Sequence, residues 1–183
     1  MDMSSSSPSA TVWLELEDDL GINVGQDSIG TNAERGVDQS PSHDVEAFDL
    51  VGKIGLGDME ISDDETTLFV MNILDKTVYA IDIATKTLSG TFPLPDPMCV
   101  GGEFRPWALS FHEGELYAGG LCDGSLSGDD PMNYNDVSAR QDLEAFVYRL
   151  DGSTFTEVLN FDLDYLREGT FGYADPCLSL IHI

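Results

Sequence analysis

Residues 55–95 constrain the fold of this chain more than any other stretch, because four short apolar runs alternate there with polar turns. The runs cover residues 59–61, 68–73, 78–83 and 88–94. Short runs that are rich in β-branched and aromatic residues, and that are bounded by turn residues, are typical of antiparallel strands. We therefore predict a meander of four antiparallel strands in this stretch.

Residues 68–88 read LFVMNILDKTVYAIDIATKTL, which resembles the YVTN-type β-propeller repeat: LYVTN, a short turn, TVSVID, then TATNTV. Met71 in place of Thr, and Glu65 in place of the Gly of the family's SPDG turn, depart from that pattern. GLGDxxIS followed by LFVMN is also similar to propeller regions of large bacterial surface proteins. The resemblance implies a propeller blade, which has four antiparallel strands. The matching residues are Leu68, Val70, Asn72, Thr77, Val78, Ile81, Asp82, Ala84, Thr85 and Thr87.

A second, weaker copy of the strand pattern follows the first. Its apolar runs cover residues 105–111, 115–121, 145–150 and 155–163. The first strands of the two copies lie about fifty residues apart, within the range of known propeller repeats. The extra length falls at residues 123–144, which are rich in Gly, Asp, Ser and Asn and which we predict to be an inserted loop. The expected fold is therefore all-β: a partial β-propeller of four-stranded antiparallel blades, with blades at 55–95 and 105–163.

The flanking segments suggest that this partial propeller, residues 11–177, comes from a longer protein. Residues 11–16, TVWLEL, and residues 47–51, AFDLV, are expected to be flanking strands, and the Ser-rich residues 1–10 are expected to be disordered. Residues 178–183, LSLIHI, are what CTGTCTCTTATACACATC encodes, a transposase end used in preparing DNA libraries. We interpret them as adapter read-through, and the alternative is a genuine apolar strand.

The formal net charge of −26 limits the classes of partner. Phosphate backbones would repel such a chain, so nucleic acid is not an expected partner. Abundant carboxylates suit divalent cations, a salty medium or the soluble surface of an exported protein. No apolar run is long enough to span a bilayer, and the N-terminal residues lack the basic and apolar regions of a signal peptide.

Cys99 and Cys122 flank the first two strands of the second predicted blade. Antiparallel pairing of those strands brings the two ends together, within reach of a disulfide. The alternative is a reactive thiol or a pair of metal ligands, but the sequence has no C-x-x-C motif and no His cluster nearby. We predict the disulfide, which implies an oxidising, extracellular or cell-surface location. Cys177 remains without an assigned pairing.

Several carboxylates are candidate Ca²⁺ ligands, because Ca²⁺ prefers oxygen ligands. None of them has the spacing of an EF-hand loop, and the alternative, that they cap turns or are solvated, stays open. The leading candidate follows a Gly-x-Gly pair at the start of an inner strand, where the resemblance places the propeller channel. The candidates are Asp58, which leads, and Asp63, Asp123, Asp129 and Asp130.

Catalytic motifs have little support in this sequence. Residues 124–128, GSLSG, place Leu126 where a nucleophile elbow requires Ser. The histidines, at positions 43, 112 and 182, form no arguable Ser-His-Asp or Cys-His set, so no catalytic residue is predicted.

Arg105 and Trp107 form a basic and aromatic pair in a very acidic chain. Recognition of a ligand at the channel is one interpretation, but we favour packing of Trp107 between blades and pairing of Arg105 with a carboxylate.

The resemblance and the composition favour a non-enzymatic binding or scaffold module of a secreted or cell-surface bacterial protein, used in adhesion or protein contact. A protein or carbohydrate surface is the expected partner, no cofactor is assigned, and Ca²⁺ is the candidate ion. The alternative is a metal-dependent propeller enzyme of the lactonase or lyase type, with its site at the channel mouth. Such an enzyme would place His or carboxylates at the start of every inner strand, whereas a scaffold would carry secretion signals and repeated appended domains.

Overall fold

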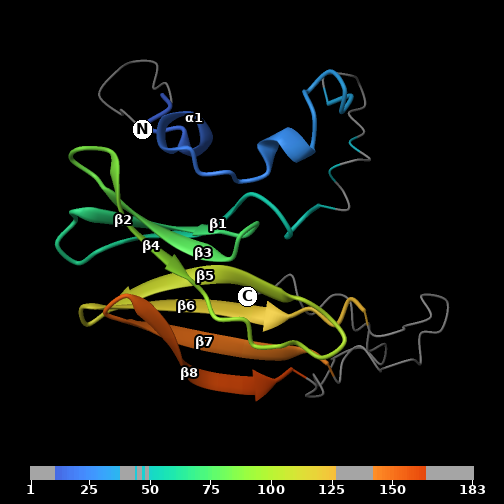
Figure 1. Cartoon of the computed structure of the whole chain (residues 1–183), viewed down its shortest axis with the longest axis vertical. Coiled ribbons are helices and arrows are strands. Elements are labelled where there is room, and N and C mark those ends of the chain that lie inside the picture. Colours follow the sequence, from blue (N-terminus) through green and yellow to red (C-terminus); the bar gives the residue numbers. More distant parts are fainter. Residues whose placement is uncertain (1–10, 38–43, 45–46, 48–49, 127–141, 164–183) are drawn as a thin grey trace, which may run out of the picture.

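Two four-stranded antiparallel sheets form most of the computed structural model, which describes residues 11–37, 44, 47, 50–126 and 142–163 (Figure 1). Strands are adjacent in chain order within each sheet, as the sequence predicts. The first sheet contains β1 (Leu56–Ile61), β2 (Thr67–Asn72), β3 (Thr77–Asp82) and β4 (Thr87–Pro93). The second contains β5 (Phe104–His112), β6 (Glu115–Cys122), β7 (Glu144–Asp151) and β8 (Thr154–Asp162).

The turn between β1 and β2 shows how local chemistry fixes a hairpin. The Asp64 carboxylate accepts hydrogen bonds from the Ser62 hydroxyl and from the hydroxyl and N–H of Thr66. These bonds, first that of Ser62, lower the pKa of Asp64. Glu65 has a φ of 58°, in the left-handed region where the YVTN-type pattern has Gly. A non-glycine residue there costs of the order of 1 kcal/mol, which the Asp64 hydrogen bonds help to offset.

The main core lies between the two sheets. Because side chains alternate along a strand, Met71 and its cross-strand partner Val78 project from the same face of the first sheet. They join a buried cluster that includes Phe104, Phe146 and Tyr148 of the second sheet. The Phe104 ring meets the other two rings edge-on, at centroid distances of 6.2 and 5.9 Å, an arrangement that aromatic quadrupoles favour.

The two sheets are stacked in the same sense. β1 contacts β5 and β4 contacts β8, so corresponding strands lie over one another. β1 and β5 also run in the same direction, since residues 58, 60 and 63 contact residues 109, 111 and 114 in that order. We call the face of the first sheet that meets the second its front face, and the face of the second sheet that meets the first its back face. Same-sense stacking leaves the back face of the first sheet and the front face of the second facing outward.

The N-terminal segment, residues 11–29, lies over the back face of the first sheet (Figure 1). The prediction of a strand at 11–16 is wrong, because α1 (Leu16–Leu20) begins there and residues 11–15 have no regular structure. Acidic residues in the first turn of α1 favour a helix, and Gly21, with a φ of 67°, ends it. A single 3₁₀ turn, η1 (Gln26–Ser28), follows.

The described residues of the predicted strand at 47–51, Ala47, Leu50 and Val51, also differ from that prediction. Leu50 and Val51 lie in a turn, where the N–H of Leu50 donates to the carbonyl oxygen of Ala47 and the N–H of Lys53 donates to that of Leu50. These local bonds take the place of a sheet partner.

Residues 1–10 and 178–183, and most of the predicted insertion, lie outside the described residues. In the described part of the chain, no helix has the length and apolarity to cross a membrane.

Replacing Met71 by Ala should test the packing between the sheets. Met71 is 0% exposed, and we expect Met71→Ala to lower the free energy of unfolding by about 2–5 kcal/mol, because it leaves a cavity between the sheets. Met98→Ala is the matched control, since Met98 is 78% exposed and its loss should change stability by about 0.5 kcal/mol or less. Urea unfolding followed by circular dichroism measures both, and equal effects would contradict this description of the core.

Candidate functional site

Three carboxylates cross from the first sheet to the second and form what we call the carboxylate ladder: Asp58, Glu60 and Asp63. Asp58 Oδ2 accepts a hydrogen bond from the N–H of Leu109 at 3.1 Å, and Glu60 Oε1 accepts one from the N–H of Phe111 at 3.0 Å. At the hairpin end, Asp63 Oδ2 accepts from the N–H of Gly114 at 3.1 Å. β5 is an edge strand of its sheet, so the ladder satisfies edge N–H groups that no neighbouring strand pairs.

Gly57 allows the two sheets to approach closely enough for the ladder. A Cβ at this position would lie 2.8 Å from the carbonyl oxygen of Trp107 and 3.1 Å from Cγ of Met71. Real Cβ atoms essentially never come that close to a backbone oxygen, so any side chain here would push β1 away from β5. The glycine before Asp58 therefore has a packing role.

The candidate Ca²⁺ ligands fall into three groups in the structure. Asp58 and Asp63 lie on the same edge of β1 and its turn, but their oxygens accept backbone N–H groups, including that of Met59 for Asp58. Asp123 lies at the end of β6, and Asp129 and Asp130 are outside the described residues. Within the described ranges, no three His, Cys, Asp or Glu side chains are placed to hold a metal ion. Ca²⁺ binding stays a prediction.

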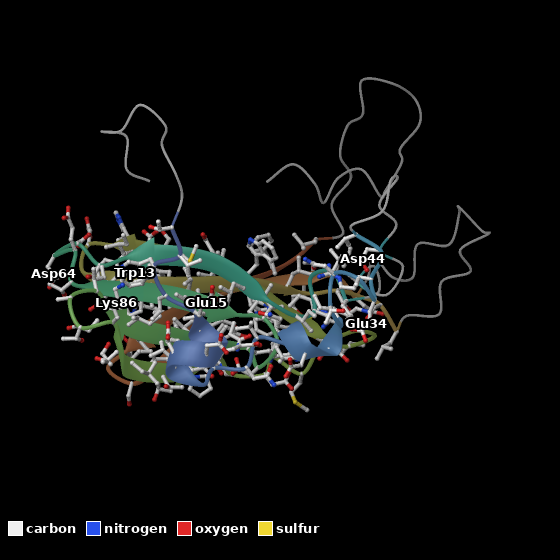
Figure 2. The ribbon with its side chains drawn as sticks, turned by 90° about the horizontal axis from the view of Figure 1, so that it is seen from above. Trp13, Glu15, Glu34, Asp44, Asp64 and Lys86 are labelled. Atoms are coloured by element: carbon white, nitrogen blue, oxygen red, sulfur yellow. A yellow bond between two sulfur atoms is a disulfide. The ribbon has the colours of Figure 1, made fainter. Side chains whose placement is uncertain are left out.

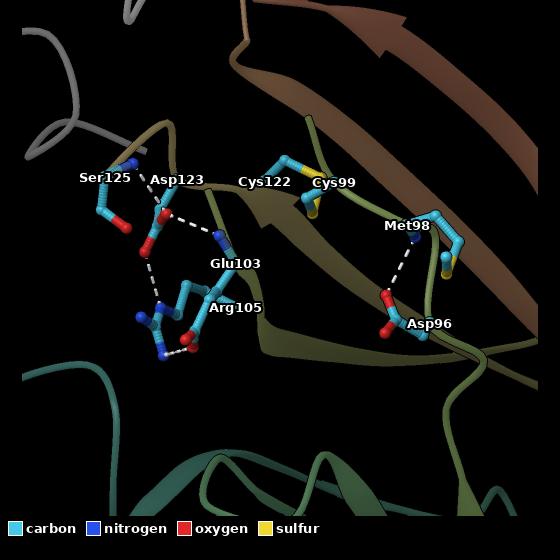
Figure 3. The surroundings of a disulfide bond; sticks show 8 residues. All are labelled: Asp96, Met98, Cys99, Glu103, Arg105, Cys122, Asp123 and Ser125. Atoms are coloured by element: carbon cyan, nitrogen blue, oxygen red, sulfur yellow. Dashed lines mark hydrogen bonds and ion pairs between the residues drawn. A yellow bond between two sulfur atoms is a disulfide. The ribbon is translucent and has the colours of Figure 1, made fainter. Parts of the chain in front are cut away.

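Asp123 is the centre of a polar cluster at the end of β6 (Figure 3). Its carboxylate accepts hydrogen bonds from Nε of Arg105 at 2.7 Å, from the N–H of Glu103 at 2.9 Å and from the N–H of Ser125 at 3.0 Å. Burial opposes ionisation of Asp123, but the contacts with Glu103, Ser125 and Arg105 outweigh it and hold the pKa well below its usual range. Asp123 is therefore charged at neutral pH and anchors the start of the loop that follows β6.

A disulfide joins Cys99 to Cys122 beside this cluster, with 5.5 Å between the Cα atoms (Figure 3). The prediction that antiparallel pairing of β5 and β6 brings these residues together is confirmed. Cys122 belongs to the core between the sheets, whereas Cys99 lies in the segment that links β4 to β5. The bond therefore ties the linker between the sheets to the second sheet.

Arg105 and Trp107 have different environments. Arg105 pairs with Asp123 and with Glu103, so its expected pairing with a carboxylate is confirmed. Trp107 is 55% exposed, which differs from the packing between blades that we favoured. It lies at an irregularity in the pairing of β5 with β6, between Pro106 and Ala108, which turns its side chain away from the core. Trp107 is therefore the exposed aromatic residue of this pair.

Tyr148 is a buried polar residue that the sequence pattern does not reveal. Its side chain is among the most buried in the core, and its hydroxyl has no hydrogen-bond partner among the described residues. Burial, followed by the charges of Glu157, Asp96 and Glu144, raises the pKa of Tyr148 to about 12. The alternation along β7 predicts only that Tyr148 points into the core, so the sequence gives no signal that its hydroxyl is buried without a partner among the described residues.

The described histidine and serine candidates do not form a catalytic arrangement. His112 is exposed at the end of β5, 3.9 Å from the Glu113 carboxylate, and Ser125 donates its N–H to Asp123. His43 and His182 lie outside the described residues.

No protein-family model matches this chain, and no curated protein sequence matches it. The case for function therefore rests on the geometry and on the sequence resemblance.

Removing one rung of the carboxylate ladder should weaken the contact between the sheets. Glu60→Ala leaves the N–H of Phe111 without its acceptor, and we expect a loss of about 1–3 kcal/mol in the free energy of unfolding. Glu60→Gln keeps an oxygen acceptor of the same length, so it should lose less than half as much. Urea unfolding compares the variants, and equal losses for Ala and Gln would show that the hydrogen bond contributes nothing.

Acidification should remove the contribution of Asp123. Its folded-state pKa lies below the unfolded value of about 3.9, so its stabilisation is complete at neutral pH and is lost as the pH falls below about 4. We expect Asp123→Asn to cost about 1–3 kcal/mol at pH 7 and about 1 kcal/mol less at pH 3. Asp18→Asn, on the exposed side of α1, is the control. A difference between wild type and Asp123→Asn that does not change with pH would contradict this assignment.

Proposed function

We propose that this chain is part of a β-propeller-type stack of blades in a secreted or cell-surface protein, and that it binds a protein or carbohydrate partner without catalysis. The observation that carries the proposal is the exposed Trp107 beside a rigid inter-sheet contact. Its backbone is held close to Gly57, while its side chain remains open to solvent. Tyr, Trp and Arg dominate the binding energy of protein interfaces, and an indole on a fixed backbone loses little entropy on binding.

The stacking of the sheets supports the propeller part of the proposal. Each sheet has four antiparallel strands in chain order, and the two pack face to face in the same sense. Blades of a propeller repeat in this manner about a central axis. Among the strand pairs that contact between the two sheets, β1 and β5 contact most extensively, and they are the first strands of their sheets, which the resemblance places beside the channel.

The chemistry of the candidate residues supports binding over metal catalysis. Asp58 and Asp123, the candidate metal ligands on the first and second sheets, accept backbone N–H groups. The disulfide between Cys99 and Cys122 suits an oxidising compartment, and it supports the proposed location outside the cytoplasm.

Binding to immobilised glycans and extracellular proteins tests the proposal. We expect saturable binding of the full chain to at least one of them, measured by biolayer interferometry in buffer with Ca²⁺ and in buffer with a chelator. Trp107→Ala should weaken that binding at least tenfold, about 1.4 kcal/mol or more, and leave the unfolding midpoint unchanged. Val100→Ala is the control, because Val100 is an exposed apolar residue of the linker.

Three results would overturn the proposal. The first is the absence of saturable binding across the panel, and the second is equal binding by wild type and Trp107→Ala. The third is turnover of lactone or uronate substrates that a chelator abolishes, which would establish the enzyme alternative. Alkylation of thiols in intact cells of the source organism tests the location, because a reduced Cys99–Cys122 pair would exclude an oxidising compartment.

A further inference from the structure

The front face of the second sheet is apolar and exposed along β8, whereas Glu115 and Arg149 form an ion pair on this face near the β5–β6 turn. Alternation and register place Leu159 beside Val147, and Phe161 beside Ala145, on the face opposite the buried Phe146 and Tyr148. Leu159 is 52% exposed and Phe161 is also exposed. The corresponding front face of the first sheet, which carries Met71 and Val78, is buried on the second sheet. The exposed face thus matches, by position, a face that is already an interface.

The back face of the first sheet carries the complementary surface, and the N-terminal segment covers it. Val70 and Ile81 project from this face, away from Met71 and Val78, and are buried outside the core cluster between the sheets. Ile22 of the segment is 4% exposed. The buried side-chain amide of Asn72 donates from this face to the carbonyl oxygen of Asn23 at 2.9 Å.

Further contacts hold the segment along its length. The N–H of Gly55 donates to the carbonyl oxygen of Val24 at 2.8 Å. Lys86 donates to the carbonyl oxygen of Trp13 at 2.8 Å and lies 5.2 Å from the centroid of the Trp13 ring (Figure 2). Polar bonds to main-chain groups at both ends of the segment, with a buried Ile between them, fix one position on the sheet.

We propose that the N-terminal segment, residues 11–29, is a cap that prevents a second copy of this chain from docking its second sheet onto the first sheet. Same-sense stacking gives the two outer faces of one chain the positions of the two sides of the interface inside the chain, so a second copy can stack its second sheet on the first sheet in the same sense. Such a contact is heterologous, so it extends from copy to copy instead of closing a dimer. Terminal elements with a polar outer surface end repeat stacks in this manner, and α1 carries exposed Asp18 and Asp19.

The contact between copies would be weaker than the contact within the chain. If Phe69 of β2 is aligned with Tyr117 of β6 by their sequence pattern, Leu-Phe and Leu-Tyr, their strand partners Glu60 and Ser110 correspond, and Asp58 then corresponds to Ala108. Two of the three rungs of the carboxylate ladder are therefore missing from the front face of the second sheet. A cap on one end is sufficient to block a contact of this strength, whereas the ladder holds the two sheets of one chain together.

Release of the cap in the full chain tests the proposal. Ile22→Asp places a charge in the contact between the segment and the first sheet and leaves both sheets unchanged. Val12→Asp is the matched control, because it adds the same charge to the same segment at a position that is 73% exposed. Sedimentation velocity in 0.15 M salt, a condition of about 8 Å Debye length, measures the size distribution over a hundredfold range of concentration.

The expected result is a series of oligomers for Ile22→Asp that grows with concentration, and monomers for wild type and Val12→Asp. Adding Leu159→Asp to Ile22→Asp should restore the monomer, whereas adding Leu126→Asp, at an exposed position away from the sheet, should not. A synthetic peptide of residues 11–29 should also dissolve the oligomers. Monomeric Ile22→Asp with a wild-type circular dichroism spectrum would overturn the proposal, as would association that Leu159→Asp leaves intact, since that marks aggregation of unfolded chains.

Discussion

The arrangement of the two sheets depends on hydrogen bonds that backbone N–H groups at the edge of the second sheet donate to carboxylates of the first. A sheet edge at an interface leaves N–H groups that need acceptors, and an unsatisfied one costs about 1–3 kcal/mol. Asp58, Glu60 and Asp63 supply those acceptors from the neighbouring sheet. Since all three side chains must meet their N–H groups together, they fix both the direction and the register of β1 against β5. Apolar packing between the sheets could not select one register in this way, because it is not directional.

The same ladder explains why Gly57 and the disulfide lie where they do. The ladder requires β1 and β5 to be close, and only a residue without a Cβ fits between β1 and the Trp107 carbonyl group. The chain must also return from β4 to the start of β5 through the linker at residues 94–103. Cys99 fastens that linker to Cys122, and the Arg105–Asp123 pair fastens the adjoining turn. These covalent and polar ties lie at the end of β5 away from the hairpin where Asp63 bonds Gly114.

The strands and the disulfide could be predicted from the sequence because both follow from local periodicity. Alternating apolar residues bounded by turns predicted the eight strands of the described residues to within a few positions, and antiparallel pairing of β5 with β6 placed Cys99 near Cys122. The strand prediction at 11–16 was wrong for a physical reason. Its apolar residues do alternate, but the segment does not pair with either edge strand of the first sheet. The acidic residues of Leu16–Leu20 favour a helix instead. The role of Asp58 depended on contacts fifty-one residues away in sequence, which no local pattern reveals.

A chain with 34 acidic and 8 basic residues has too few cations to pair its carboxylates, so it must use them differently. The structure assigns them to backbone N–H groups: in turns, as at Asp64 and Asp82; across the sheets, as at Glu60; and beside one of the few arginines, as at Asp123. A hydrogen bond from a fixed N–H to a partly buried carboxylate is short-ranged, so salt screens it less than it screens long-range repulsion between surface charges. Raising the ionic strength therefore relieves the repulsion of the acidic surface while leaving the ladder in place, which makes a salty exterior a favourable solvent for this fold.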